Sequence, residues 1–217
     1  MLKFENINAS IAGTPILRDV NLNVEKGTMV GLIGRNGAGK TTSLRTVMGL
    51  LKPTSGQVII DGQDMTVEGA YERAALHVGY MPEDRRLVPD LTVEENILVP
   101  AWANEIPNLT SRLAWIYELM PEVEAFSSRR ALQLSGGQQK LVALARALMS
   151  GSHLLLLDEP FEGVAPALSR RLASVLHTLK DEGLTVLLSE SDYTHSADLL
   201  DAGYRIERGS VTPIEQH

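Results

Sequence analysis

The chain has 217 residues, which fits one large domain or a core with an inserted subdomain, and its 44% hydrophobic and 22% charged residues are ordinary for a globular protein. The net charge of −7 argues against a surface that tracks nucleic-acid phosphates, and the lack of cysteine excludes disulfides, thiolate metal sites and thiol catalysis. No apolar run approaches the roughly 18 residues that span a bilayer, so we expect a soluble chain that reaches a membrane only through a partner.

Short strand-like runs alternate with turn signals at the start of the chain, which predicts an antiparallel sheet at the edge of the fold. Strands are expected at Leu2–Ile7 and Val20–Val24, with a turn at Gly13–Pro15 between them. Met29–Ile33 is continuously apolar, which is typical of a strand buried on both faces. A helix is predicted after it over Thr41–Leu50, ended by a glycine and a proline.

Strands and helices alternate again later in the chain, on either side of a helical block. Further strands are predicted at 57–61, 77–81, 154–158 and 184–189, with a helix over 167–182. Residues 84–150 are helical in character and are punctuated by proline, as at Pro89, Pro100, Pro107 and Pro121. This pattern predicts a single α/β domain over 1–217. Residues 1–83 and 151–217 would form a parallel-sheet core with the antiparallel edge sheet, and 84–150 an inserted α-helical subdomain.

A glycine-rich loop follows the strand at Met29–Ile33. Gly34-x4-Gly39-Lys40-Thr41 matches the Walker A pattern, between a buried strand and a helix. Glycines let backbone N–H groups curl around phosphate oxygens, and the helix start adds partial positive charge. We expect Lys40 to reach the β- and γ-phosphates of ATP, Thr41 to ligate Mg²⁺ and Thr42 to touch the α-phosphate. The nucleotide-binding residues predicted here are Gly34, Asn36, Gly37, Ala38, Gly39, Lys40, Thr41 and Thr42. The alternative is a glycine-rich turn with an exposed lysine.

Two carboxylates stand at the end of the apolar run Leu154–Leu157, where ligands collect in open α/β sheets. Asp158 suits Mg²⁺, directly or through a water. Glu159 points elsewhere on an extended chain and is placed to accept a proton from, or to orient, an attacking water. Without the phosphate loop, two solvated acids at a strand end would be the simpler interpretation.

A third motif, Leu134-Ser135-Gly136-Gly137-Gln138, precedes an apolar helical pattern. Ser135 is expected to cap that helix, and the two glycines leave its N-terminus bare for an anion. With the other two motifs in this order, the chain resembles the nucleotide-binding subunit of an ATP-binding cassette (ABC) transporter over nearly all of its length.

The resemblance implies a P-loop NTPase (RecA-like) fold and an ATPase that powers transport, with ATP and Mg²⁺ bound. It implies that the signature residues Ser135, Gly136, Gly137 and Gln138 contact the γ-phosphate held by an opposite subunit, so that two subunits close head to tail over two ATP molecules. The implied partners are transmembrane permease subunits, and the implied location is the cytoplasmic face of the inner or plasma membrane. Membrane contact would come only through the permease, and no nucleic acid is expected.

Two segments indicate which branch of the family the chain resembles. Met81–Arg86, at the Q-loop position, and Gly163–Pro166, at the D-loop position, look like import ATPases for branched-chain amino acids, amides and urea. In that branch two non-identical ATPases often pair, which leaves homodimer and heterodimer both open. Asp158–Val164 also resembles lipopolysaccharide-export ATPases, so a lipid exporter is the alternative.

The sequence departs from the family pattern at three functional positions. Ala12 stands near the expected adenine-stacking aromatic residue, and the neighbouring Ile11 could pack there instead. Glu83 replaces the usual glutamine, where a carboxylate can approach Mg²⁺ but adds negative charge beside the phosphates. Ser191 replaces the switch histidine and can donate one hydrogen bond to the γ-phosphate but cannot carry charge. His195, one helical turn further on, is expected to be an ordinary helix residue.

These departures lead to the hypothesis that the subunit binds nucleotide weakly and hydrolyses it slowly alone, beside a partner with a more complete site. A nucleotide-sensing subunit is therefore a second alternative, although Glu159 argues against complete inactivity. Non-transport ABC proteins usually carry coiled-coil insertions or two fused cassettes, for which this chain has no room. Arg85, Arg86 and Leu87 are candidates to hold a coupling helix of the membrane subunit, or else form a solvated loop.

Overall fold

Two β-sheets organise the computed structural model, which describes residues 1–106 and 108–214. The antiparallel sheet has the order β2-β1-β4-β5, formed by β1 (Leu2–Ile11), β2 (Thr14–Val24), β4 (Ser55–Ile60) and β5 (Gln63–Asp64). The second sheet has the order β10-β9-β3-β8-β7-β6, formed by β3 (Met29–Ile33), β6 (Val78–Met81), β7 (Leu154–Asp158), β8 (Thr185–Glu190), β9 (Ala202–Glu207) and β10 (Ser210–Pro213). Its strands run parallel from β9 to β6, and β10 is antiparallel to β9.

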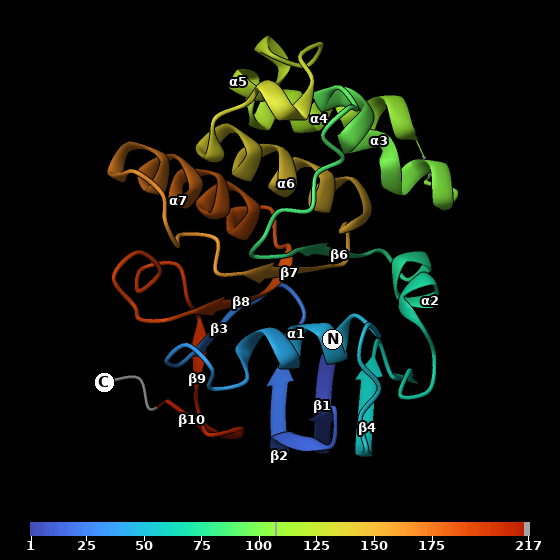
Figure 1. Cartoon of the computed structure of the whole chain (residues 1–217), viewed down its shortest axis with the longest axis vertical. Helices are drawn as coiled ribbons and strands as arrows, with labels where there is room; N and C mark the ends of the chain where they lie inside the picture. Colours follow the sequence, from blue (N-terminus) through green and yellow to red (C-terminus); the bar gives the residue numbers. More distant parts are fainter. Residues whose placement is uncertain (107, 215–217) are drawn as a thin grey trace.

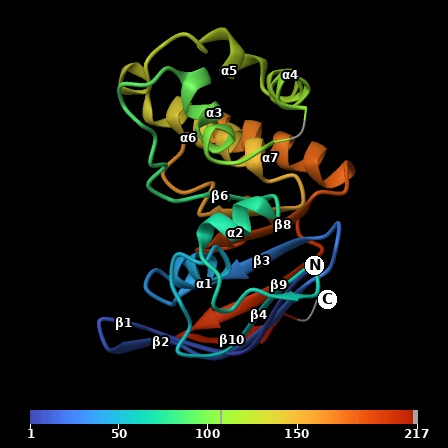
Figure 2. The ribbon, with the colours of Figure 1, turned by 90° about the vertical axis from the view of Figure 1, so that its right-hand side faces the viewer.

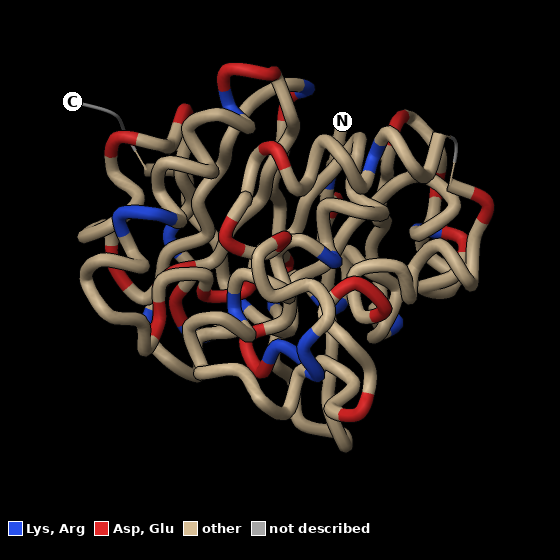
Figure 3. The backbone as a smooth tube through the Cα atoms, turned by 90° about the horizontal axis from the view of Figure 1, so that it is seen from above, with Lys and Arg blue, Asp and Glu red and all other residues tan. Residues whose placement is uncertain are grey.

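The helices are α1 (Lys40–Val47), α2 (Ala70–Ala75), α3 (Val93–Ala103), α4 (Leu109–Leu119), α5 (Pro121–Ala125), α6 (Gly136–Ser150) and α7 (Pro166–Asp181), with a 3₁₀ turn at Ala131–Gln133. Helices α3 to α6 gather at one end of the molecule and the antiparallel sheet lies at the other, with the parallel strands between them (Figures 1 and 2). Acidic and basic segments are interleaved along the described backbone (Figure 3).

The parallel strands are continuously apolar because each has a hydrophobic layer on both faces. Successive side chains of a strand point to opposite faces, so alternate residues enter different cores. Met29 and Leu155 join the core formed with α6 and α7, whereas Val30 and Leu156 join the core formed with α1 and the antiparallel sheet. This double covering fixes the central strands and, with them, the loops at their ends.

The predicted parallel core and antiparallel sheet are confirmed, with several corrections to the elements. The first two strands are longer than predicted, because the chain reverses at Ala12 and Gly13 and β2 already begins at Thr14. Helix α1 ends at Val47, before the left-handed Gly49 (φ 71°). The sequence patterns did not predict α2, β5, β9 or β10. Residues 191–199 form bends and turns, so His195 does not lie in a helix, contrary to the expectation. The predicted break at Pro107 lies outside the described residues.

One buried arginine ties α2 to the chain around it. The Arg73 side chain, 1% exposed, donates hydrogen bonds to the backbone carbonyls of Val47 (2.7 Å), Glu68 (2.6 Å), Met65 and Gly69. Arg73→Met would leave these carbonyls without their donor, and we expect it to lower the free energy of unfolding by about 3 kcal/mol. Urea denaturation would measure this loss.

The matched control is Arg170→Met, because Arg170 is exposed on α7. That change is expected to stay within about 0.5 kcal/mol of the parent protein. Equal unfolding midpoints for the two variants would contradict the role given to Arg73.

Candidate active site

The predicted site residues meet at one edge of the parallel sheet. Strands β3, β6, β7 and β8 run in the same direction, so their carboxyl ends lie together. Beyond those ends stand Gly34 after β3, Glu83 after β6 and Ser191 after β8, while β7 ends with Asp158 and is followed by Glu159. The register pairs Ile33 with Glu190 and Asp158 with Ser189, which brings loops far apart in sequence side by side.

The loop from Gly34 to Gly39 connects β3 to α1 in a conformation that requires glycine. Gly39 caps α1 with φ 115°, a backbone conformation that L side chains rarely adopt. A Cβ on Gly34 would lie 2.2 Å from the carbonyl oxygen of Ile206 on β9, so the loop can pass this strand only without a side chain. Lys40 is therefore the first residue of the helix, at its electropositive end.

A cavity of about 350 Å³ opens over the start of α1. Its lining residues are Ile16, Asn36, Gly37, Gly39, Lys40, Thr41, Thr42, Glu83 and Glu159. A neighbouring hollow of about 170 Å³ brings Asp158 and Tyr80 together with Thr41 and Glu83. Most of the residues predicted for phosphate, metal and catalysis thus surround one region at the edge of the sheet.

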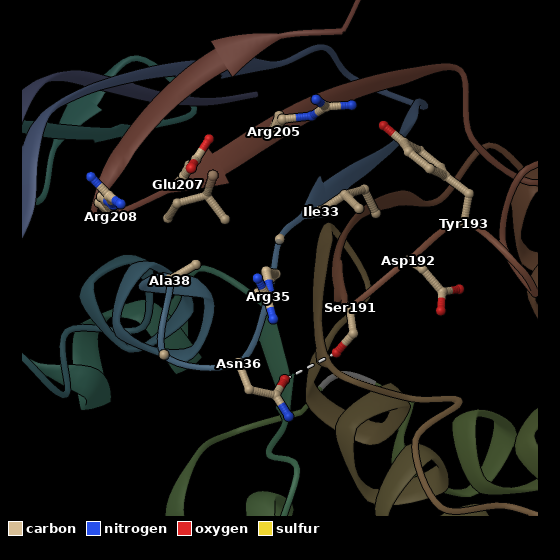
Figure 4. Close-up of a pocket in the computed structure, with 13 residues that line it drawn as sticks. Ile33, Arg35, Asn36, Ala38, Ser191, Asp192, Tyr193, Arg205, Glu207 and Arg208 are labelled. Carbon is tan, nitrogen blue, oxygen red and sulfur yellow. Dashed lines mark hydrogen bonds between the residues drawn. The ribbon is translucent and has the colours of Figure 1, made fainter.

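A larger cavity of about 700 Å³ lies on the other side of the glycine loop (Figure 4). Asn36 and Gly37 line both this cavity and the one over α1, so the loop is the wall between them. Tyr193 and Arg205 project toward one another at its rim in Figure 4. Neither Lys40 nor Thr41 is among the described residues that line it, so we place the phosphate chemistry in the smaller cavity.

A buried ion pair joins the glycine loop to the end of β7. Lys40 Nζ lies 2.9 Å from Glu159 Oε1, and the two side chains are only 3% and 5% exposed. The ammonium also donates a hydrogen bond to the carbonyl oxygen of Gly34 at 2.6 Å. A buried ammonium requires an anionic partner. Glu159 fills that role here, and phosphate oxygens entering the cavity would compete with it.

Glu159 is held from several directions. Its backbone has φ 49° and its N–H donates to the Ser189 carbonyl at 3.1 Å. Burial opposes the charged form, but hydrogen bonds from Glu162 and Lys40 outweigh it, so the pKa of Glu159 lies below its ordinary value. The hydrogen bond to Glu159 raises the pKa of Glu162 to about 7, with burial adding to the effect. Glu162 is therefore the member of the pair that takes up a proton first as the pH falls.

Asp158 is buried and receives three hydroxyl contacts. Ser189 Oγ donates to Asp158 Oδ1 at 2.8 Å, Thr41 Oγ1 to the same oxygen at 3.1 Å, and the Tyr80 hydroxyl to Oδ2 at 3.2 Å. Burial raises the pKa of Asp158, and the three hydrogen bonds partly offset it. Hydroxyl and carboxylate oxygens are the donors that Mg²⁺ prefers, and Thr41 and Asp158 are already in contact, with Glu83 lining the same hollow. These residues fit the metal that the family pattern implies.

Ser191 lies beside Glu159. Its Oγ is 3.1 Å from Glu159 Oε2 and 3.1 Å from Asn36 Oδ1 (Figure 4). A hydroxyl has one proton, so it can donate to only one of these oxygens. Asn36 Oδ1 also lies 3.5 Å from the Lys40 ammonium, which keeps an acceptor oxygen at this position. Ser191 therefore connects the glycine loop to the carboxylate after β7.

The signature residues start helix α6 as predicted. Ser135 Oγ accepts a hydrogen bond from the Gln138 N–H at 3.3 Å, and Gln138 Oε1 accepts from the Ser135 N–H at 3.0 Å. The predicted N-cap is confirmed, and the Gln138 side chain is occupied by it. In the described part of the chain, the residues from Ser135 to Gln138 line neither cavity beside the glycine loop. The structure thus does not bring the signature to the same chain's phosphate loop.

Several residues of the site were not predicted from sequence. Ile16 lines the cavity over α1, whereas Ile11 is 45% exposed and is not among the described residues that line it, and Ala12 lies at the tip of the hairpin. Packing of Ile11 against adenine stays a prediction. Ser189 and Tyr80 lay in runs interpreted as strands, and only the strand register shows that both face Asp158.

The loop of Arg85 to Leu87 is anchored to α6. Arg85 Nη1 donates to the Gly136 carbonyl at 3.1 Å, and Arg146 donates to the carbonyls of Arg85 and Arg86. Leu87 packs against the hydrophobic core. Of the three residues considered for docking a membrane subunit, Arg86 is the most exposed to solvent. In the described structure its side chain pairs only with Asp84, at 2.9 Å. None of the helices in residues 1–106 and 108–214 has both the length and the hydropathy needed to cross a bilayer.

Comparisons with known proteins all point to the same family. Residues 17–162 match the ABC transporter family. The high-affinity branched-chain amino acid transport ATP-binding protein BraG of Pseudomonas aeruginosa is 34% identical over 97% of this chain and 91% of its own length. The lipopolysaccharide export system ATP-binding protein LptB of Haemophilus influenzae is 32% identical over 97% of this chain and 88% of its own. The dimeric structure of MJ0796, a bacterial ABC transporter cassette, superposes with a TM-score of 0.87 at 26% identity and covers both chains completely.

The Walker A loop, the carboxylates after β7 and the capped signature helix therefore lie in the fold that this family uses to bind and hydrolyse nucleotide. The chain belongs to the ABC transporter family, as an ATP-binding subunit whose ATP hydrolysis is coupled to transport.

Proposed function

We propose that this ATPase powers an importer of branched-chain amino acids, amides or urea. The similarity to BraG over nearly the whole chain carries this proposal. Glu83 at the Q-loop position and the Gly163–Pro166 segment, both typical of that import branch, support it. A lipid exporter is the second candidate, because LptB is almost as similar and Asp158–Val164 resembles that branch.

The roles of the site residues follow from their positions. Backbone N–H groups of the loop from Gly34 to Gly39 would cradle the phosphates, with Lys40 at the β- and γ-phosphates and Thr42 at the α-phosphate. As Lys40 turns to the phosphates, the Glu159 carboxylate is released to accept a proton from the attacking water. The water oxygen bonds to the γ-phosphorus as the bond to ADP breaks, and Ser191 donates a hydrogen bond at that position.

We assign the metal site to Thr41 and Asp158, with Glu83 approaching from the turn after β6. Mg²⁺ bound there would neutralise charge on the phosphates. Asp158 is held by Ser189 and Tyr80, so its oxygens are oriented before any ligand arrives.

The second half of the site would come from another subunit. Because the signature residues line neither cavity of their own described chain, we propose that they cap the γ-phosphate of a partner in a head-to-tail dimer. The partner is a second copy or a different ABC ATPase, and permease subunits would hold the pair at the cytoplasmic face of the membrane. In this assembly 84–150 would act as the helical subdomain, and 1–83 with 151–217 as the core.

Formation of a catalytic dimer by two copies of this chain is tested by measuring MgATP hydrolysis over a series of protein concentrations. A rate per molecule that rises with concentration would show that the chain forms its own catalytic dimer. Folded protein that binds ATP without turnover at any concentration would contradict self-sufficiency, and would favour a nucleotide-sensing subunit beside a second ATPase.

The substrate is tested with the permease subunits reconstituted in liposomes. ATP-dependent uptake of radiolabelled leucine, an amide or urea would support import. Extraction of lipopolysaccharide by the same assembly, without uptake of any of these solutes, would instead support the exporter.

Substitutions of Ser191 test how much this residue limits the rate of ATP hydrolysis. Ser191→Ala is expected to lower kcat several-fold, because Glu159 loses one of its hydrogen-bond donors. Ser191→His is expected to raise kcat about 10-fold, since an imidazole can carry charge toward the γ-phosphate and the 700 Å³ cavity leaves room for the ring. Phosphate-release kinetics would measure both. Identical kcat values for the three proteins would contradict any catalytic role of this position.

A further inference from the structure

A buried lysine on the signature helix holds the turn that carries the catalytic carboxylate. Lys140, 5% exposed, donates hydrogen bonds from Nζ to the carbonyl oxygens of Glu159 at 2.8 Å and Glu162 at 2.7 Å. Lys140 is the fifth residue of α6, whereas Glu159 follows β7. A single side chain thus connects the helix that begins with the signature to the backbone of the proposed base.

The turn needs such a restraint. Glu159 is in the left-handed region at φ 49°, which is uncommon for a residue with a long side chain. Its carbonyl also accepts the Glu162 N–H at 3.2 Å, which closes the turn. This conformation directs the Glu159 carboxylate toward Lys40 and Ser191, so loosening the turn would move the carboxylate away from both.

A second buried side chain holds the same turn. Glu190, buried at the end of β8, accepts the Phe161 N–H of the same turn at 3.1 Å. Burial lowers the pKa of Lys140, while the charges of Glu190 and Glu162 oppose that effect. The Lys140 ammonium and the Glu190 side chain therefore both hold the turn, one through carbonyl oxygens and one through an N–H group.

Because Lys140 lies on α6, its hydrogen bonds connect the turn at Glu159 to the helix that begins with the signature. Lys140 stands about 6 Å along the helix axis from Gly136, at 1.5 Å per residue. The N-terminus of this helix is the part that would face nucleotide on the partner subunit. A rigid helix moved at its N-terminus carries Lys140 with it, and with Lys140 the backbone of Glu159.

We propose that Lys140 is a positioning residue for ATP hydrolysis. It fixes the turn from Glu159 to Glu162 to the signature helix, so that the orientation of the Glu159 carboxylate depends on the position of that helix. The proposal rests on the proposed roles of Glu159 and of the signature in a dimer. In the part of the chain that the structure describes, Lys140 does not line the nucleotide cavity, and its side-chain hydrogen bonds go to the backbone of the turn that carries the base.

The test compares Lys140→Met, which removes the donor, with Lys140→Arg, which keeps it. The matched control is Lys180→Met, because Lys180 on α7 also donates to a backbone carbonyl, that of Leu199 at 2.7 Å, but away from the turn. We expect Lys140→Met to lower kcat about 10- to 100-fold with KM within about 2-fold, and Lys140→Arg to recover most of it. Lys180→Met should leave kcat within about 2-fold.

Hydrogen–deuterium exchange provides a readout that does not need turnover. Lys140→Met should speed amide exchange at residues 159–163 about 10-fold, and Lys180→Met should not change it there. Unchanged exchange in this turn, or a wild-type kcat in Lys140→Met, would overturn the proposal. So would an equal increase of exchange throughout α6 and the core, since that describes a general loss of stability.

If Lys140→Met does not fold, Lys140→Gln is measured in its place. Because glutamine keeps a neutral N–H donor, we expect the same changes in kcat and in amide exchange, but smaller ones. Absence of turnover in the parent protein alone would count against the proposed catalytic self-dimer, while the exchange comparison would still decide the role of Lys140.

Discussion

Glu159→Gln is expected to lower steady-state ATP turnover by about 100- to 1,000-fold without weakening ATP binding. A glutamine amide has nearly the shape of the carboxylate but cannot accept a proton from the attacking water. The change also removes the anion that pairs with Lys40 in the buried 2.9 Å contact. Phosphates would no longer compete for the ammonium, so ATP affinity should rise a few-fold. Phosphate release and titration with a fluorescent ATP analogue measure the two effects.

Glu118→Gln is the matched control, because it makes the same chemical change at a position that is exposed on α4. Its turnover should match that of the parent protein. If Glu159→Gln kept more than about a tenth of the parent rate, the base would have to be sought elsewhere at this edge of the sheet.

Lys40→Met should weaken ATP binding by about 100-fold, or about 2.7 kcal/mol, because the buried ammonium is the only lysine among the described residues that line the cavity over α1. The variant also leaves the Glu159 carboxylate buried beside Ser191 and Glu162 without its cationic partner. We therefore expect a loss of about 2 kcal/mol in the free energy of unfolding. Nucleotide titration and urea denaturation would measure these two losses.

A double variant separates the two consequences. Lys40→Met with Glu159→Gln should regain most of the lost stability, since no unpaired carboxylate remains, but should still bind ATP poorly. The exposed Lys52→Met serves as the control for removing one positive charge. ATP affinity in Lys40→Met that equals that of Lys52→Met would contradict the assignment of the phosphate site.

The residues of the glycine loop could be predicted because they are contiguous. Gly34, Gly39, Lys40 and Thr41 act through one loop between a strand and a helix, so their spacing alone specifies the backbone path around a phosphate. The N-cap formed by Ser135 and Gln138 is local for the same reason. The continuous apolar runs likewise identified the central strands, because burial on both faces leaves no alternation.

The remaining parts of the site depend on contacts between distant segments. Ile16, rather than Ile11, reaches the nucleotide cavity because the hairpin turns at Ala12 and Gly13 and sets the register of β2. The pairing of β7 with β8 brings Ser189 to Asp158, and nothing in either strand's own sequence specifies that partner.

The sequence by itself therefore determined the family pattern, the phosphate loop, the two carboxylates and the helix cap, since each is encoded within a few consecutive residues. Only the tertiary structure decided that Lys40 pairs with Glu159, that Ser191 connects Asn36 to that carboxylate, and that Lys140 holds the turn behind it. The physical reason is that these contacts join groups separated by many residues, and strand register and helix packing, which place them, arise from the burial of two whole hydrophobic cores.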